Sequence, residues 1–91
     1  MTTEHTAEEI RMLRAELEML MNERQSLLRA TGAAAVFVAN LDSESLPETT
    51  YVVADILAHA LNELPEDTLR DALELVRPTV DAASTEKAQE S

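Results

Sequence analysis

Apolar residues recur at spacings of three and four along the first third of the chain. Five leucine and isoleucine residues carry this repeat: Ile10, Leu13, Leu17, Leu20 and Leu27. Because this spacing places every one of these side chains on one side of an α-helix, the pattern predicts a helix with a narrow apolar stripe. A stripe this narrow is not buried by its own helix. It therefore predicts a partner helix, either from this chain or from a second copy.

A helix start and a break in the repeat accompany this stripe. Residues Thr6 and Glu9 have the spacing of a capping box, in which each side chain bonds the backbone N–H of the other residue. When Ile10 is placed at position a of a seven-residue repeat, Arg24 falls at position a two repeats later. A single polar residue at that position commonly sets the register or the oligomeric state of a coiled coil. In a parallel pair, Glu9 would meet Arg14 of the neighbouring helix. The charged positions that follow along the helix would not meet opposite charges, so the sequence leaves open whether the pair is parallel or antiparallel.

Beyond the stripe, the apolar positions widen until the whole run from Ala33 to Ala39 is apolar. A helix that is apolar on nearly all sides is surrounded by protein, and the alanines allow neighbouring helices to approach closely. Gly32 costs about 1 kcal/mol relative to alanine inside a helix, so it marks a kink or ends the helix. We predict one long heptad-bearing helix over residues 6–41, with Gly32 as the place for a bend. A short buried strand at Val36–Asn40 is the alternative, although the sequence offers no second strand to pair with it.

The second half of the chain has the pattern of two shorter helices. Residues 42–47 (DSESLP) predict a loop, and the segment from Ser45 to Glu48 offers another capping box. Apolar residues then follow helical spacing up to Pro65, which suits the first turn of the next helix. The stripe of that next helix consists of Leu69, Ala72, Leu73 and Val76, opposite two i,i+4 pairs formed by Glu66, Arg70 and Glu74. Pro78 closes it, so residues 48–78 predict a helical hairpin folded onto the alanine-rich segment.

The two ends of the chain lack an apolar period. Residues 1–5 are predicted to be a disordered N-terminus and residues 79–91 a disordered acidic tail. The fold class is therefore all-α: a long N-terminal coiled-coil-like helix followed by a short acidic helical hairpin. The ordered part makes a thin aliphatic core, and the absence of cysteine excludes disulfides. Since oligomerisation is the support that remains, we expect a homodimer.

Charge narrows the range of partners. The chain carries 18 acidic and 7 basic residues, for a net charge of −11. Residues 1–41 have a net charge of −2 and residues 42–91 a net charge of −9. Such a surface repels phosphate, which argues against direct nucleic-acid binding. It suits a basic protein partner, or it serves only solubility. The residues predicted to contact such a partner are Glu66, Asp67, Asp71 and Glu74.

Residues that could carry chemistry are few. Asp55, His59 and Glu63 lie four apart on one helix face, which is typical of a solvated face and less often of a metal site. The only other histidine is His5. With no cysteine and one glycine, the chain offers no thiol nucleophile and no phosphate-binding loop. We therefore expect no catalytic residue, cofactor or metal.

These observations predict a non-enzymatic protein–protein interaction module, a small adaptor or regulator that acts as a homo-oligomer. Its predicted oligomer interface consists of Ile10, Leu13, Leu17, Leu20, Arg24 and Leu27. One alternative is an acidic inhibitor, encoded by a phage or mobile element, that imitates nucleic-acid charge. Another is a metal-dependent enzyme subunit that uses the face of Asp55, His59 and Glu63. The sequence contains no membrane span and no signal segment, which predicts a cytoplasmic protein without membrane contact.

Three methionines flank the stripe, Met12, Met19 and Met21. Their flexible side chains would broaden a buried seam or form an adaptable binding surface.

Overall fold

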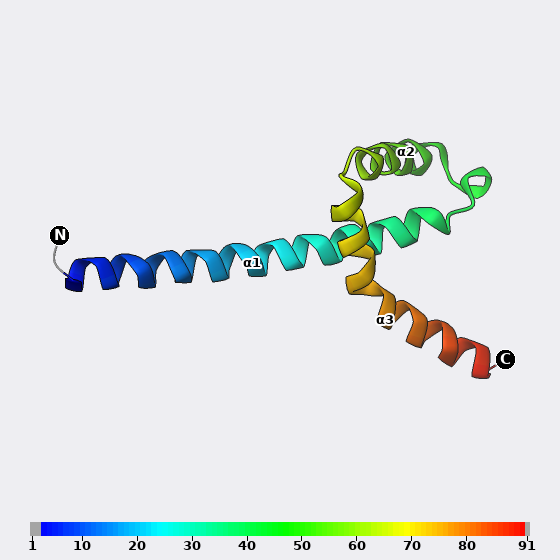
Figure 1. Cartoon of the computed structure of the whole chain (residues 1–91). Coiled ribbons are helices and arrows are strands. Elements are labelled where there is room, and N and C mark those ends of the chain that lie inside the picture. The colour runs from blue at the N-terminus through cyan, green and yellow to red at the C-terminus, as the bar shows by residue number, and fades with distance from the viewer. Residues whose placement is uncertain (1–2, 91) are drawn as a thin grey trace.

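The computed structural model describes the backbone of residues 3–90 and the side chains of residues 6–86. It consists of three α-helices and one short 3-10 helix, in the order α1 (Thr3–Ala39), η1 (Ser43–Ser45), α2 (Glu48–Asn62) and α3 (Glu66–Glu90). Figure 1 shows this order along the chain. The predicted all-α class is confirmed, and the alternative strand at Val36–Asn40 is wrong because α1 continues to Ala39.

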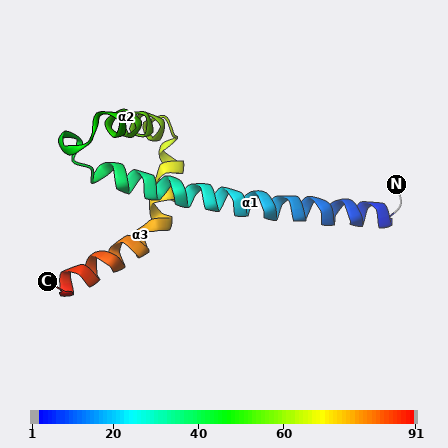
Figure 2. The same cartoon turned by 180° about the vertical axis from the view of Figure 1, so that it is seen from behind.

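The molecule is a rod with a helical head at one end. Helices α2 and α3 lie against the C-terminal half of α1, whereas the N-terminal half of α1 extends away from them (Figures 1 and 2). The extents are 65 × 35 × 21 Å and the radius of gyration is 19.7 Å. A compact chain of this length would have a radius of gyration of about 12 Å. The fold therefore leaves much of its longest helix without an intramolecular neighbour.

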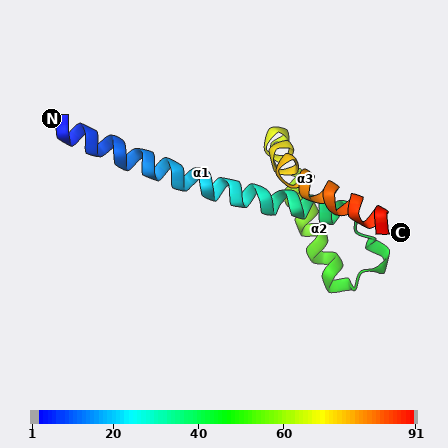
Figure 3. The same ribbon diagram turned by 90° about the horizontal axis from the view of Figure 1, so that it is seen from below.

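The core lies where α3 crosses α1 (Figure 3). Its buried apolar side chains, among residues 6–86, are Leu28, Leu61, Ala72 and Val76. A Cβ atom on Gly32 would overlap the backbone carbonyl oxygen of Ala72 and would lie 3.1 Å from Cγ2 of Val76. Gly32 therefore does not end α1, which continues to Ala39, and its missing side chain leaves the space that α3 occupies.

Helices α2 and α3 do not form a hairpin that packs on itself. Helix α3 makes the larger contact with α1 and α2 a smaller one, while direct contact between α2 and α3 is slight. The predicted hairpin is therefore corrected to two helices that each use α1 as their support. The turn between them forms as expected, since the Leu69 N–H donates to the Pro65 carbonyl oxygen at 3.1 Å.

Helix α3 does not end at Pro78, as the sequence pattern predicted, but continues to Glu90. Segment 79–91 is thus helical as far as Glu90, and Ser91 lies outside the described residues. Val80 is half-buried and lines a groove with Val36 and Val76, so contact with α1 supports the helix past the proline. Helix α3 bends between its two halves (Figure 1), which is the usual effect of an internal proline.

The helix ends also differ from the predicted ones. Helix α1 begins at Thr3, before the predicted cap at Thr6, so residues 3–5 are helical and residues 1–2 lie outside the description. At its other end, the Asn40 side chain donates to the Val36 carbonyl oxygen at 2.8 Å. The capping box at Ser45 does not form, and Pro47 caps α2 without a side-chain hydrogen bond. Ser45 instead ends the 3-10 helix η1, where its hydroxyl donates to the Asp42 carbonyl oxygen at 2.9 Å.

Candidate functional site

The apolar stripe predicted from the sequence begins on the free half of α1 and runs to the edge of the head. We call it the N-terminal stripe: Ile10, Leu13, Leu17, Leu20 and Leu27. Every one of these side chains is exposed, from 44% at Ile10 to 69% at Leu27. In the part of the chain that the structure describes, no other helix lies beside the N-terminal half of α1 (Figure 2). Large apolar side chains exposed in a row are typical of an interaction surface.

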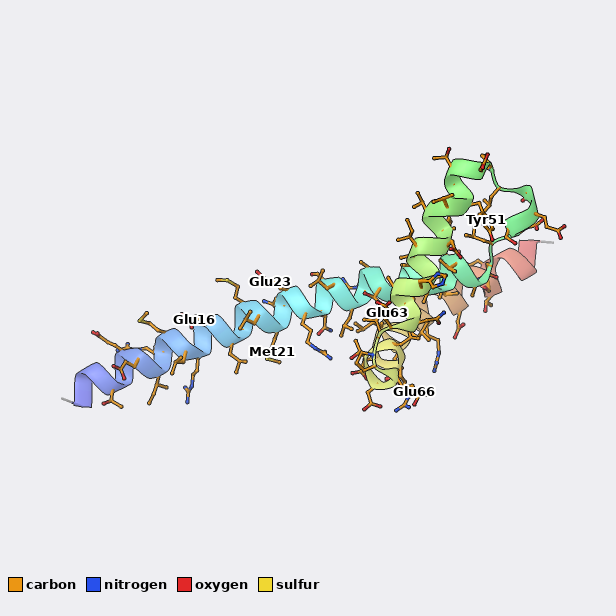
Figure 4. All side chains as sticks on the ribbon, turned by 90° about the horizontal axis from the view of Figure 1, so that it is seen from above. Glu16, Met21, Glu23, Tyr51, Glu63 and Glu66 are labelled. Carbon is orange, nitrogen blue, oxygen red and sulfur yellow. The ribbon has the colours of Figure 1, made fainter. Side chains whose placement is uncertain are left out.

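Charged and apolar residues flank this stripe on different sides. Glu16 and Glu23 lie along one side of α1, and Met21 lies along the opposite side (Figure 4). In the seven-residue repeat these are positions g and e, which border the seam of a coiled coil. All three side chains are exposed, so a helix that docks on the stripe would meet carboxylates on one side, and on the other side Met21 together with the basic residue Arg14, also at position e.

Arg24 interrupts the stripe but its guanidinium leans toward the head. Its Nη2 atom lies 3.7 Å from Oδ2 of Asp71 on α3. Both side chains are more than half exposed, so this ion pair contributes little to stability. Its structural effect is that the charge of Arg24 lies at the edge of the seam, while its aliphatic stem stays beside the leucines.

The stripe ends in a groove at the head. This groove has a volume of about 370 Å³ and lies between α1 and the α2–α3 turn. Its lining includes Leu27, Leu28, Leu64 and Thr68. One turn further along α1, Thr31 and Ala34 continue positions a and d of the repeat and border a second groove with Leu57 and Leu61 of α2. Helix α2 therefore takes the place of a partner helix along the C-terminal half of α1.

The four acids predicted to contact a basic partner are all exposed on the first turns of α3: Glu66, Asp67, Asp71 and Glu74. Glu66 lies near the start of α3, away from the free half of α1 (Figure 4). Two of the four are engaged within the fold, because Asp71 meets Arg24 and Asp67 Oδ1 lies 3.4 Å from Nη1 of Arg70. Arg70 thus pairs with Asp67 three residues earlier, not with Glu66 and Glu74 as the spacing suggested.

The face of Asp55, His59 and Glu63 lies on the exposed side of α2. His59 Nδ1 is 2.8 Å from the Asp55 carbonyl oxygen and 3.7 Å from Asp55 Oδ1. The hydrogen bond to this backbone oxygen, together with the Asp55 and Glu63 carboxylates, raises the pKa of His59 above its ordinary value. Among the residues whose side chains are described, no three histidine, aspartate or glutamate side chains are grouped so as to hold a metal ion.

Sequence reasoning missed an exposed apolar surface on α2. The sequence pattern gave the helical spacing of its apolar residues without indicating which are exposed, and in the structure Tyr51, Val52, Val53 and Ile56 are each about half exposed or more. These residues surround the first half of α2, and within residues 3–90 this helix packs mainly against α1. A helix with apolar residues on several sides and one neighbour must leave some of them in water. The sequence pattern already predicted three helices, so the small number of neighbours available to this helix could have indicated the exposed surface.

Comparisons with known proteins identify no significant match to this chain. The chain matches no protein-family model, and neither a curated protein nor a solved structure is significantly similar to it. Within residues 3–90, no helix combines the length and the apolar character needed to cross a membrane.

Proposed function

We propose that this protein is a non-enzymatic protein–protein interaction module that works as a homodimer, with the N-terminal stripe as its association surface. The observation that carries the proposal is the exposed row from Ile10 to Leu27, most of which lies on a helix half that has no neighbour in the described chain. A row of apolar side chains at heptad spacing is recognised by another helix of the same kind. A second copy supplies such a helix.

The exposed area supports this proposal. The chain exposes 7700 Å² to solvent. A compact monomer of this mass would expose about 5,200 Å². The difference exceeds the roughly 1,200–2,000 Å² that a stable protein interface buries in total. A monomer that leaves this much surface in water has a small core for its length, and association is the means by which such chains gain burial.

The distribution of charge allows two copies to meet at this surface. The stripe belongs to residues 1–41, whose net charge is −2, whereas residues 42–91 carry −9. Repulsion between two chains is therefore weakest along the free half of α1. An interface through the head would instead bring together the two most acidic regions.

The other two functions suggested by the sequence have weaker support. The acidic face of α3 would suit a basic partner, but Asp67 and Asp71 already lie beside arginines. A metal-dependent enzyme would need ligands that converge, and the His59 ring is held against the backbone of its own helix. Neither objection applies to association through the N-terminal stripe.

Sedimentation equilibrium of a matched pair of variants tests the proposal. Leu17 and Met19 are 57% and 62% exposed on the same stretch of α1, but only Leu17 lies in the stripe. Leu17→Asp places a charge in the interface and is expected to give a monomer. Met19→Asp places the same charge at position c, outside the interface, and is expected to leave the dimer intact.

Two results would contradict the proposal. One is a wild-type chain that is monomeric at about 100 μM, since an obligate interface is occupied at that concentration. The other is equal dissociation by Leu17→Asp and Met19→Asp, which would mean that general charge repulsion, and not the stripe, controls association. Circular dichroism of both variants checks that the helices are retained.

A further inference from the structure

We infer that the second copy pairs with α1 in the antiparallel direction, so that Ile10 of one copy faces Leu27 of the other. This inference rests on the proposed function, because it concerns how two N-terminal stripes meet. The repeat of apolar residues permits both directions. The position of the head relative to the stripe distinguishes between them.

Helix α2 obstructs a parallel pair. Beyond Leu27, positions a and d of the repeat are Thr31 and Ala34, and this side of α1 is occupied by α2 and by Leu64 of the following turn. In a parallel pair, the second α1 would continue along the same side as far as Ala39, because α1 is one unbroken helix. It would pass through the volume of α2. A parallel pair therefore requires α2 to leave α1.

An antiparallel pair confines this overlap to the first turns of the second α1, because Thr6 of that copy falls opposite Thr31 and Thr3 falls opposite Ala34. The head of the second copy then lies at the far end of the first α1, and the residues of the second α1 after Ala34 extend past Thr3, where the described chain has no other element (Figure 1). Only the first turns of the second α1 reach the head. There they meet the groove of about 370 Å³ beside Leu27, Leu64 and Thr68.

The spacing of the stripe fits one antiparallel register along its whole length. Ile10 faces Leu27, Leu13 faces Arg24 and Leu17 faces Leu20, each position a meeting a position d. Because the arrangement is symmetric, every pair occurs twice. Leu13 then covers the aliphatic stem of Arg24, whose guanidinium lies toward Asp71. In a parallel register, the two Arg24 side chains would face each other in one layer.

Long-range charge also favours the antiparallel direction. Residues 42–91 of each copy carry a net charge of −9. A parallel pair places two such regions side by side. An antiparallel pair places them at opposite ends of the rod, where salt screens the repulsion between them. Local flanking charges oppose this preference, because Glu16 approaches Glu23 in the antiparallel register and Glu9 would meet Arg14 in the parallel one. These exposed contacts are weak compared with the overlap of a whole helix.

Disulfide trapping tests the direction, because the chain has no cysteine of its own. Three variants are made separately: Ile10→Cys, Leu27→Cys and, as a control for random collision, Met19→Cys. In the antiparallel register, two copies of Cys at position 10 are separated by about 25 Å along the helix, and a disulfide needs Cα atoms within roughly 7 Å. Ile10→Cys and Leu27→Cys are therefore each expected to stay uncrosslinked alone under mild oxidation, whereas their mixture forms a covalent dimer. Met19→Cys is expected to stay uncrosslinked because position c faces away from the partner helix.

The outcomes separate the two proposals. Sedimentation of the reduced variants reports whether a dimer exists, so a monomer there contradicts the proposed function itself. If the reduced variants are dimeric and Ile10→Cys crosslinks by itself, the pair is parallel and only the direction is wrong. If the reduced variants are dimeric but the mixture of Ile10→Cys and Leu27→Cys stays uncrosslinked, the register is wrong. Crosslinking of Met19→Cys at the same rate would mean that the reaction reports collision and that the inferred pairing has no support.

Discussion

Gly32 of α1 and Ala72 of α3 bring the two longest helices into contact backbone to backbone. Ala72 is fully buried, and a Cβ atom built on Gly32 would overlap the Ala72 carbonyl oxygen. Since the obstructing atom belongs to the backbone, it does not move away as a flexible side chain would. The crossing of α1 and α3 therefore depends on the absence of a side chain at Gly32.

Substituting Gly32 is expected to destabilise the fold even though glycine is a poor helix former. Gly32→Ala gains about 1 kcal/mol of helix propensity, but crowding of a packed core costs about 1–3 kcal/mol or more. Gly32→Val adds further bulk and is expected to lower the free energy of unfolding by more than 2 kcal/mol. Urea denaturation measures the change, with Ala33→Val at the exposed neighbouring position as the control. Equal effects of the two valine substitutions would contradict the role given to Gly32.

Much of the helical fold follows from the sequence, but its arrangement follows less directly. The period of the apolar residues predicts three helices, and Pro65 predicts the turn between α2 and α3. The pattern could not indicate that Gly32 is a packing site, because a bend and a close helix crossing both require glycine. It also placed α2 and α3 against each other, since short loops bring helices together without fixing which faces meet.

The candidate surface was easier to predict than the fold around it. The stripe from Ile10 to Leu27 is visible in the spacing of apolar residues, and the structure leaves it exposed. The groove in which the stripe ends was not predictable, because Leu64 and Thr68 are brought beside Leu27 only when the head folds. The ion pair between Arg24 and Asp71 was missed for the same reason, as the two residues are distant in sequence.

A charge reversal at Glu16 is expected to strengthen the dimer. In the antiparallel register, Glu16 of one copy lies near Glu23 of the other, so Glu16→Lys replaces a repulsive contact with an attractive one, twice per dimer. The dissociation constant should fall several-fold, and less so at high salt. Glu18→Lys makes the same change in net charge at position b, outside the seam, and serves as the control. If both substitutions tighten the dimer equally, net charge explains the effect and Glu16 is not beside Glu23.

His59 is expected to titrate above the usual histidine value of about 6.5. The hydrogen bond to the Asp55 carbonyl oxygen raises its pKa most, followed by the Asp55 carboxylate. Because the pKa is higher in the folded state, the stabilisation is fully present below the unfolded value and is lost as the pH rises through the folded value. An NMR titration measures the shift. Asp55→Asn should lower the pKa of His59 partway, since the backbone oxygen remains, and Glu63→Gln should lower it less; an unchanged pKa in Asp55→Asn would contradict the assignment.

Leu27 and Leu28 are adjacent leucines that we expect to support different processes. Leu28 is 7% exposed in the contact between α1 and the head, whereas Leu27 is 69% exposed in the N-terminal stripe. Leu28→Ala removes a core side chain and is expected to lower the free energy of unfolding by about 2 kcal/mol or more. Leu27→Ala removes a side chain from the interface, so it should change the unfolding of the monomer by less than about 0.5 kcal/mol.

Urea denaturation over a range of protein concentrations separates these two effects, because dimerisation stabilises the folded state more as concentration rises. The midpoint of the wild-type chain is expected to increase with concentration. Leu28→Ala should lower the midpoint at every concentration and retain the slope. Leu27→Ala should keep the low-concentration midpoint and lose most of the increase, because each dimer then lacks two buried leucines and its dissociation constant rises about tenfold or more. A Leu27→Ala variant with the full concentration dependence would place the interface elsewhere on the molecule, and the exposed residues Tyr51, Val52 and Ile56 of α2 would then be the next surface to test.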